Sequence, residues 1–265
     1  MMKRTDVLCY ATLPDGYSFA ESIAAAAAGG FKELSLWLMT IDAACNELGS
    51  LQAVQACLDQ HGMTATSIEL LHAWPRGEHA DVRQEIEVMQ AAIEVFEPEL
   101  IMAGCMDPDI EDWQRAADWL QQECEALAPV KIALEFLPWS ALPDPVAVKQ
   151  FVDAVAADNL GFVLDSWHFV RSGADYEALA EIPGDKVYFV QLSDVAAMAG
   201  EDIFAETLGE RLVPGQGVID WPRLMTTLEQ MGVNCPISTE QFSNAIKAMP
   251  LEQAVTALYQ GLQYP

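Results

Sequence analysis

Oxygen-bearing side chains end four successive apolar runs in the second half of the chain. They are Glu135, Asp165, Gln191 and Glu240, at the ends of the runs 132–135, 162–165, 187–191 and 236–240. A carboxylate at the end of a buried strand is costly to desolvate unless a partner compensates it. On neighbouring strands these groups would meet at one place, where a divalent cation is the simplest partner for so much oxygen. For any one of them alone, capping of the following helix or pairing with a nearby cation is the alternative.

The runs therefore predict that one divalent metal ion is bound by these four residues. All-oxygen ligation favours Mn²⁺ or Mg²⁺, and Zn²⁺ and Co²⁺ remain as alternatives. Four nitrogen-bearing side chains are candidates for binding substrate oxygens. His168 and Arg171 follow the run that ends at Asp165, His72 directly follows the run 65–71, and Arg211 lies in the long connection after the run that ends at Gln191. For Arg171 a salt bridge is the competing interpretation, and for His168 it is a contact with a neighbouring carboxylate. Asp194, three residues past Gln191, would orient a ligand or cap the segment that follows.

Short apolar runs alternate with amphipathic stretches along the whole chain. The expected strands cover residues 7–12, 33–38, 65–71, 100–104, 131–136, 161–165, 186–192 and 236–241. The expected helices run from the cap Ser18 to Gly29 and over 51–60, 81–96, 109–127, 144–156, 176–180, 222–231 and 243–262. Most of the strand runs are continuously apolar, as in a parallel sheet covered on both faces.

Eight strand–helix units at a spacing of roughly thirty residues, without a linker, predict an α/β fold: a (β/α)8 TIM barrel that forms a single domain over residues 1–265. An open doubly wound sheet is the alternative, and it would show a Gly-rich phosphate turn after an early strand, which Leu-Pro-Asp-Gly at 13–16 is not. In such barrels the active site lies at the C-terminal ends of the strands, where the four oxygen-bearing residues fall. The long connection 195–219 is expected to form a lid over this end, with Pro214 and Gly215 making a turn that aims Arg211 inward.

Composition excludes several classes of function. The formal net charge of −27, from 40 acidic and 13 basic residues, opposes binding to nucleic acid or to an anionic membrane. Six cysteines without a C-x-x-C pair indicate a reduced protein, and we expect a mature cytoplasmic chain with no signal peptide. Large apolar barrels often pair, so a homodimer is an open alternative.

Five segments together resemble the xylose isomerase-like TIM-barrel superfamily, the sugar phosphate isomerase/epimerase group related to endonuclease IV. They are Ala-Leu-Glu-Phe-Leu-Pro at 133–138, Gly-Phe-Val-Leu-Asp-Ser-Trp-His at 161–168, Val-Gln-Leu-Ser-Asp at 190–194, Arg-Leu-Val-Pro-Gly-Gln-Gly at 211–217 and Ser-Thr-Glu at 238–240. The resemblance implies a metal at the four residues named above. It also implies that Glu135 and Glu240 are the catalytic acid/base pair, with His168 and Arg211 near substrate.

The implied activity is that of a metal-dependent isomerase or epimerase that removes a proton next to a carbonyl in a ketose or related polyhydroxy carbonyl compound. Epimerases of this group commonly carry histidine where Gln191 stands. Glutamine there resembles the 3-dehydroshikimate dehydratase branch, so a dehydratase acting on dehydroshikimate or an inosose is the alternative. A further histidine of that branch is absent, since Phe136 and Leu137 take its place.

Two other interpretations are less favoured. A non-catalytic sugar-binding barrel is one of them. A multi-zinc nuclease is the other, and it would need more histidines than the four present. The cation that follows the eighth expected strand is Lys247, inside the last helix, so the sequence favours an unphosphorylated sugar, polyol ketone or hydroxy-keto acid as the substrate.

Overall fold

Eight parallel strands close into one barrel, in the order of the sequence, in the computed structural model, which describes residues 6–76 and 79–265. The strands are β1 Asp6–Cys9, β2 Glu33–Trp37, β3 Thr64–Leu71, β4 Leu100–Gly104, β5 Lys131–Glu135, β6 Leu160–Asp165, β7 Val187–Leu192 and β8 Ile237–Thr239. β1 pairs with both β2 and β8, which closes the ring. The (β/α)8 barrel predicted from the alternating runs is therefore confirmed.

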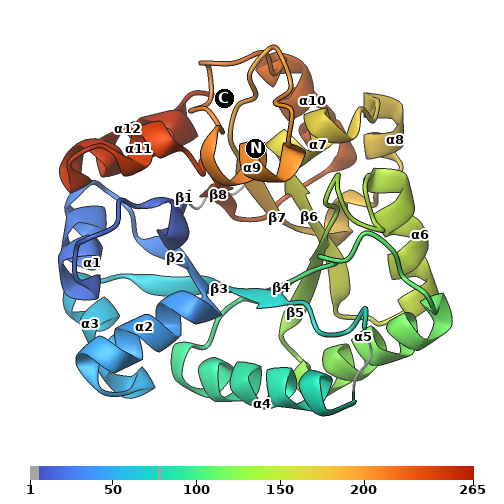
Figure 1. Cartoon of the computed structure of the whole chain (residues 1–265), viewed down its shortest axis with the longest axis horizontal. Coiled ribbons are helices and arrows are strands. Elements are labelled where there is room, and N and C mark those ends of the chain that lie inside the picture. Colours follow the sequence, from blue (N-terminus) through green and yellow to red (C-terminus); the bar gives the residue numbers. More distant parts are fainter. Residues whose placement is uncertain (1–5, 77–78) are drawn as a thin grey trace.

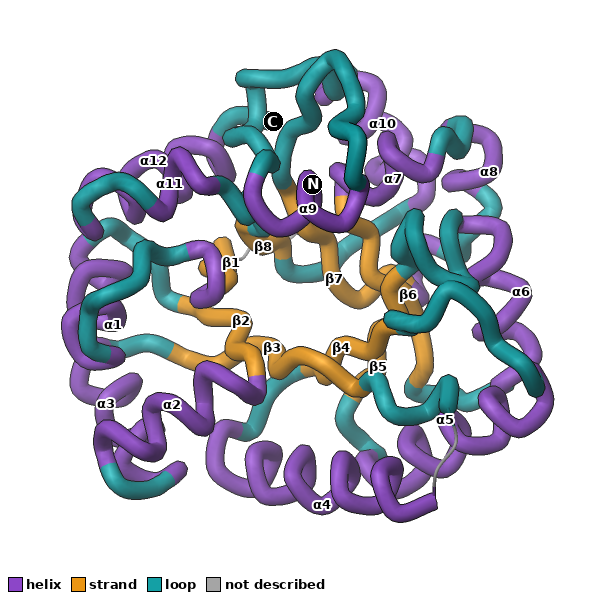
Figure 2. The backbone as a smooth tube through the Cα atoms, viewed as in Figure 1, coloured by secondary structure: helices purple, strands orange, loops and turns teal. Residues whose placement is uncertain are grey.

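Helices surround the strands on the outside of the barrel (Figure 1). They are α1 Phe19–Ala28, α2 Leu38–Leu48, α3 Leu51–His61, α4 His79–Phe96, α5 Trp113–Leu127, α6 Pro145–Val155, α7 Ser166–Ser172, α8 Tyr176–Ala180, α9 Ile203–Gly209, α10 Trp221–Met231, α11 Asn244–Lys247 and α12 Leu251–Gln263, with 3-10 turns at Tyr10–Thr12 and Gly184–Lys186. Figure 2 shows the helical ring around the strands and the teal loops that join them. None of the helices in the described part of the chain is long and apolar enough to cross a membrane.

Local sequence signals account for where several helices begin. Ser18 and Glu21 form a reciprocal capping box at the start of α1. Asp144 accepts a hydrogen bond from the Ala147 amide, and Pro145 occupies the first turn of α6. These helices match the expectations from sequence within one or two residues.

Other elements differ from those expected. α2 was not expected, because no capping signal separates it from β2: Trp37 caps it without a side-chain hydrogen bond. α7 was not expected either, and the helix expected over 243–262 is divided into α11 and α12, since Pro250 cannot continue a helix. β1 is shorter than expected because residues 10–12 form a 3-10 turn.

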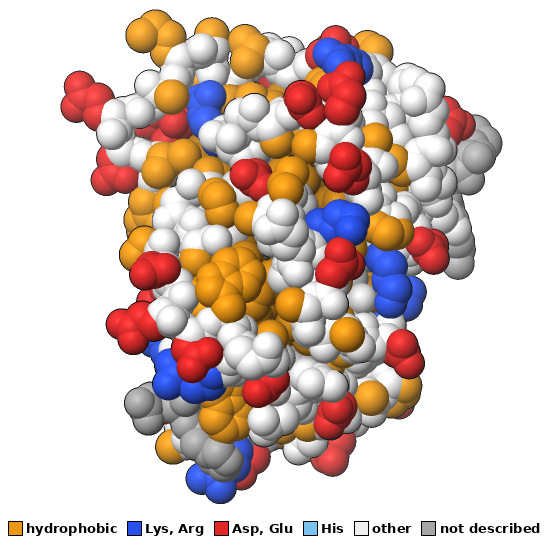
Figure 3. Space-filling view, turned by 90° about the vertical axis from the view of Figure 1, so that its right-hand side faces the viewer, with side chains coloured by type: hydrophobic (Ala, Val, Ile, Leu, Met, Phe, Trp, Pro, Cys, Tyr) orange, Lys and Arg blue, Asp and Glu red, His pale blue; other side chains and the backbone are white. Residues whose placement is uncertain are grey.

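Apolar side chains fill two regions. The larger cluster lies between the strands and the helices, and a smaller one comes almost wholly from barrel strands and includes Val7, Met102 and Phe189. A barrel filled in this way is a packed core with its site at one end rather than a pore. On the face drawn in Figure 3, acidic side chains are scattered among polar and apolar ones and form no single patch.

Candidate active site

A cavity of about 420 Å³ lies at the C-terminal end of the barrel strands. Its lining includes Glu135 at the end of β5 and Glu240 directly after β8, together with His168 and Arg211. Two of the four run-end residues, Glu135 and Glu240, thus share one cavity, whereas Asp165 and Gln191 are not among the residues that line it. The rest of the wall is mainly apolar: Trp37, Leu38, Met39, Leu70, Met106, Leu137, Trp139, Phe204, Leu208 and Phe242.

Asp165 ends β6 and at the same time caps α7. Its Oδ1 accepts hydrogen bonds from the backbone amides of Trp167 (2.7 Å) and His168 (2.9 Å). Its Oδ2 accepts from Arg211 Nη1 at 2.7 Å. Burial alone would raise the pKa of Asp165, but the charges of Arg211 and His168 outweigh it and hold the pKa below its ordinary value. Both alternatives that the sequence left open for this residue, a helix cap and a partner for a cation, are thus realised in the fold.

Arg211 is buried to 2% exposure and its guanidinium is fully engaged. Nη1 donates to Asp165 and to the Glu240 carbonyl (3.1 Å), and Nε donates to the Thr207 carbonyl (2.9 Å). Nη2 donates to Thr207 Oγ1 (2.7 Å) and lies 3.3 Å from His168 Nε2. A guanidinium has five N–H donors, so the protein supplies an acceptor for four of them, and His168 Nε2 accepts from the fifth only when it carries no proton.

His168 lies between Arg211 and Glu135. Its Nε2 is 3.2 Å from Glu135 Oε1 and 3.3 Å from Arg211 Nη2. Arginine can only donate and a carboxylate can only accept, so the two contacts require opposite roles of Nε2 and compete with each other. His168 Nδ1 is buried and has no hydrogen-bond partner among the described residues.

Glu240 is tied to β7 by Gln191, whose Nε2 donates to Glu240 Oε2 at 2.7 Å. Burial, followed by the charge of Glu69, raises the pKa of Glu240 well above its ordinary value. Gln191 Oε1 is buried and has no hydrogen-bond partner within residues 6–76 and 79–265. The amide oxygen of Gln191 is therefore available as a metal ligand next to the carboxylate of Glu240.

The sequence did not single out Glu69, which lies within β3 and lines the cavity. Its Oε1 accepts a hydrogen bond from Ser35, and burial raises its pKa to about 7. Cys9 Sγ and the carboxylates of Glu69 and Glu240 lie within 4.8 Å of one another, and burial raises the pKa of the Cys9 thiol. The available signal was a charged residue inside an expected strand, which is costly to bury unless it is used or paired.

His72 and Arg171 are placed differently from the other predicted substrate-binding residues. His72 lines the rim of the cavity, with 58% of its side chain exposed, and its Nδ1 lies 2.7 Å from Glu85. The hydrogen bond to Glu85 raises the pKa of His72. Arg171 is not among the cavity-lining residues. It binds Glu206 on α9 and the Ala196 carbonyl (3.0 Å), as its salt-bridge alternative predicted.

The connection 195–219 covers the cavity through α9, whose Phe204, Thr207 and Leu208 form part of the wall. Asp194 organises this connection. Its carboxylate accepts hydrogen bonds from four donors: the amides of Val195 (2.8 Å), Gly215 (2.8 Å) and Ile219 (3.1 Å) and Trp221 Nε1 (3.0 Å). A bridge on each side of Arg211, Glu210 with Ser243 and Asp194 with Leu212, holds its backbone in place. Gly215, in the turn expected after it, has a positive φ of 90°.

Glu135, Asp165 and His168 each offer one ligand atom, and these atoms lie within 4.8 Å of one another. They are a set of carboxylate oxygens and one imidazole nitrogen. Gln191 is the β7 residue paired with Asp165 in the sheet, and its Oε1 lacks a hydrogen-bond partner in the described chain. Hard divalent cations prefer oxygen, and imidazole extends the range to transition metals. The residues present thus fit a divalent metal ion, which Glu135, Asp165 and His168 would hold. Glu240, the fourth predicted ligand, lies in a separate group with Cys9 and Glu69.

Curated proteins with known activities resemble about half of this chain. It is 33% identical over 139 residues to the 3-dehydroshikimate dehydratase of Pseudomonas aeruginosa, a match that covers 51% of the chain and 22% of that protein. It is 32% identical over 128 residues to the inosose isomerase of Bacillus subtilis, a match that covers 48% of the chain and 45% of that protein. The chain therefore matches less than half the length of either relative.

Solved structures share the whole fold. The IOLI protein with a binding zinc atom superposes with a TM-score of 0.88 at 21% identity, over 97% of this chain and 96% of that one. D-allulose 3-epimerase from Methylomonas sp. does so with a TM-score of 0.73 at 15% identity, over 99% and 97%. Residues 23–261 match the family described as xylose isomerase-like TIM barrel. With this match over most of its length, the chain belongs to the xylose isomerase-like TIM barrel family.

Proposed function

We propose that this protein is a divalent-metal-dependent isomerase or epimerase. Its substrate would be a ketose or a related polyhydroxy carbonyl compound, from which a proton is removed at the carbon next to the carbonyl. The observation that carries the proposal is that Glu135 and Glu240 line one cavity, on the β5 and β8 sides of the barrel end. Similarity to an inosose isomerase and to a D-allulose 3-epimerase supports the same class of reaction.

Two carboxylates on separate walls suit proton transfer to and from a substrate held between them. One glutamate removes the proton, and the proton returned from the other wall inverts the carbon. Return to the adjacent carbon converts a ketose to its isomer. Positioned acid–base groups of this kind typically contribute about 10²–10⁴-fold to the rate.

The residues proposed to hold the metal are Glu135, Asp165, Gln191 and Glu240. A bound divalent cation supplies Lewis-acid polarisation of the carbonyl and hydroxyl oxygens of the substrate. Arg211 holds Asp165 in position, and His168 faces the substrate beside Glu135. Similarity to a protein that binds zinc adds support for a divalent ion and leaves Mn²⁺, Mg²⁺ and Co²⁺ open as well.

A dehydratase is the second candidate. Glutamine at position 191 and the similarity to a 3-dehydroshikimate dehydratase favour it. The first step, proton removal next to a carbonyl, is the same in both reactions. The two differ in the fate of the carbanion equivalent, which either takes back a proton or expels hydroxide.

A panel of compounds in deuterated water separates these candidates. Ketoses, inososes and 3-dehydroshikimate are each incubated with Mn²⁺-loaded protein and then recovered. Deuterium on carbon in the recovered compound or its epimer indicates an isomerase or epimerase, and a product smaller by one water indicates a dehydratase. If no compound exchanges a proton or loses water, the proposed function is wrong.

Metal content tests the proposed ligands independently of turnover. We expect one divalent ion per chain in the wild type and much less in Asp165→Ala, because that substitution removes a ligand and leaves Arg211 unpaired. Equal metal content in the two proteins would contradict the assigned site.

A further inference from the structure

The cavity offers little to a negatively charged substrate. Among the described residues that line it, Arg211 is the sole Lys or Arg. Four of its five N–H groups have acceptors in the protein, the fifth lies 3.3 Å from His168 Nε2, and its charge is paired with Asp165. A phosphate or carboxylate entering the cavity would have to displace a buried hydrogen bond from Arg211, at the cost of an unsatisfied protein acceptor. His72, at the rim, is paired with Glu85.

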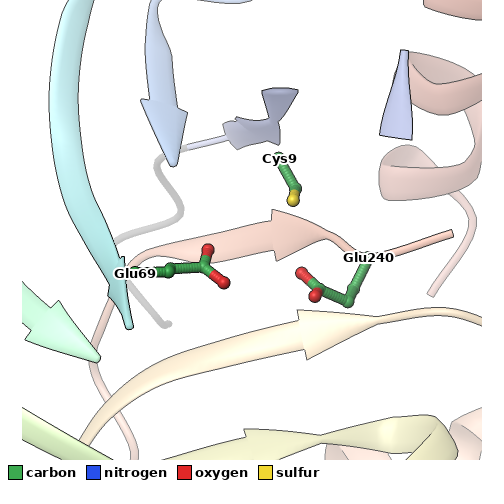
Figure 4. A group of neighbouring side chains, drawn as sticks. All are labelled: Cys9, Glu69 and Glu240. Carbon is green, nitrogen blue, oxygen red and sulfur yellow. The ribbon is translucent and has the colours of Figure 1, made fainter. Parts of the chain in front are cut away.

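Glu69 adds a third carboxylate to this cavity, and it is held in place from behind. Ser67 Oγ donates to Ser35 Oγ at 2.5 Å, and Ser35 in turn donates to Glu69 Oε1. Ser35 and Ser67 are both fully buried, on β2 and β3. In Figure 4 the carboxylates of Glu69 and Glu240 point toward one another across the end of the barrel. Two hydroxyl groups therefore hold the Glu69 side chain in position. The proton transfer proposed for Glu135 and Glu240 does not require this third carboxylate.

A fixed carboxylate at this position suits the hydroxyl groups of a substrate. In its ionised form the carboxyl group only accepts, has room for several hydrogen bonds and bonds strongly to O–H donors. It repels phosphate and carboxylate groups at short range, which is the kind of unfavourable contact that generates specificity. The apolar part of the wall, which includes Trp37, Trp139 and Phe242, suits the C–H face of a ring.

We propose that Glu69 is a specificity-determining residue that accepts a hydrogen bond from a substrate hydroxyl. Because the guanidinium of Arg211 is already engaged by acceptors in the protein, Glu69 restricts the cavity to uncharged polyhydroxylated carbonyl compounds. This inference rests on the proposed function and narrows it: ketoses and polyol ketones are substrates, and their phosphorylated or carboxylated counterparts are not. Ser35 is a positioning residue that acts through Glu69.

Calorimetric titration of the metal-loaded protein tests this with matched probes. D-allulose is compared with its 6-phosphate, and an inosose is compared with 3-dehydroshikimate. We expect each neutral probe to bind the wild type at least about tenfold more tightly than its anionic counterpart. In Glu69→Gln this ratio falls about tenfold, since the neutral probe loses a charge-assisted hydrogen bond and the anion loses a repulsion.

The matched control is Glu33→Gln. Glu33 begins β2 and accepts from Thr66 Oγ1, so it is also a hydroxyl-bonded glutamate, but at the opposite end of the barrel. This variant retains the wild-type ratio. Ser35→Ala keeps the charge of Glu69 but removes the hydroxyl that holds its side chain in place. We therefore expect an affinity ratio between those of the wild type and Glu69→Gln. The Ser35→Ala variant also supplies the test if Glu69→Gln does not fold, as judged by circular dichroism.

Three results would overturn the inference: anionic probes that bind the wild type as tightly as the neutral ones, an equal change for both probes of a pair in Glu69→Gln, and no binding of either class. Binding and exchange separate the two proposals. Selective binding of neutral probes without deuterium exchange supports the role of Glu69 and contradicts the isomerase. Deuterium exchange with a phosphorylated ketose or with 3-dehydroshikimate supports proton removal next to the carbonyl and contradicts the role of Glu69.

Discussion

The two halves of the barrel end bury polar groups in different ways. On the β5–β8 side, Asp165 and Arg211 form an ion pair whose remaining donors and acceptors are used by backbone groups and by His168. On the β1–β4 side, Glu69 is held by serine hydroxyls and has no cation as a direct partner in the described contacts. The pKa of Asp165 is lowered by its partner, and that of Glu69 is raised by burial.

The difference shows that burial does not by itself determine the state of a carboxylate. Both groups are almost wholly removed from water, and the nearest partner decides the direction of the pKa shift. The long connection 195–219 supplies Arg211 to one half, whereas the described connections that follow β1–β4 reach their first helix sooner. The charged half suits proton transfer and metal binding, and the hydroxyl-bonded half suits recognition.

The largest expected effect tests whether the acid/base pair lies in the β5–β8 half of the barrel end. We expect Glu135→Gln and Glu240→Gln each to lower proton exchange by about 10²–10⁴-fold, because an amide neither accepts nor returns the proton. The measurement is the rate of deuterium incorporation into the substrate that the wild type turns over. Glu33→Gln serves as the control and keeps the wild-type rate. Exchange within a few-fold of wild type in both active-site variants would remove the proposed roles.

The ion pair between Arg211 and Asp165 in the β5–β8 half is expected to contribute strongly to the free energy of unfolding. Arg211→Met leaves Asp165 buried without its partner, and we expect a loss of about 3–5 kcal/mol in the free energy of unfolding in urea. The matched control is Arg76→Met. Arg76 pairs with Asp107 at 3.0 Å on the other half, but its side chain is 69% exposed, so the loss stays below about 1 kcal/mol. Similar losses in both variants would contradict the contrast.

Asp194 tests whether the covering segment depends on one carboxylate. Asp194→Asn replaces an acceptor oxygen by an N–H₂ group and leaves some of its donors unpaired, at about 1–3 kcal/mol of unfolding free energy. Faster proteolytic cleavage within 195–219 should accompany the loss. Asp202→Asn, in the same segment, changes an N-cap for which asparagine is about as good, so it should have little effect. Equal proteolysis of the two variants would argue against the role of Asp194.

A third buried carboxylate, that of Glu123 in α5, lies in the helical layer. It has no hydrogen-bond partner in the described structure. Burial raises its pKa to about 9, from an ordinary value of 4.5. The folded state then binds more protons than the unfolded state between these values, so this group's contribution to stability is present below pH 4.5 and is lost as the pH rises toward 9.

We expect Glu123→Gln to remove this loss and to be increasingly more stable than wild type as the pH rises from 5 to 8, by at most about 1.4 kcal/mol per pH unit. Urea unfolding at several pH values measures the difference between the two proteins. Glu125→Gln, at an exposed neighbouring position, should follow the wild-type curve. Parallel curves for wild type and Glu123→Gln would show that Glu123 is not buried as a neutral acid.

The sequence by itself determined the barrel and one half of its site. Continuous apolar runs and capping signals such as Ser18 and Asp144 act over a few residues, so the eight units could be predicted within a few positions of their ends. Glu135 and Glu240 could be placed at one cavity because the C-terminal ends of parallel strands in a closed barrel necessarily meet. The metal, substrate and catalytic assignments remain predictions.

Tertiary structure alone decided how these groups pair. That Arg211 binds Asp165, that Arg171 binds Glu206 and that Ser35 holds Glu69 depends on contacts between segments far apart in sequence. Hydrogen bonds and ion pairs depend on distance and direction to within fractions of an ångström, and no local pattern encodes these. Glu69 was missed for this reason: only closure of the barrel brings this charged residue of β3 to a place where its carboxylate faces Glu240.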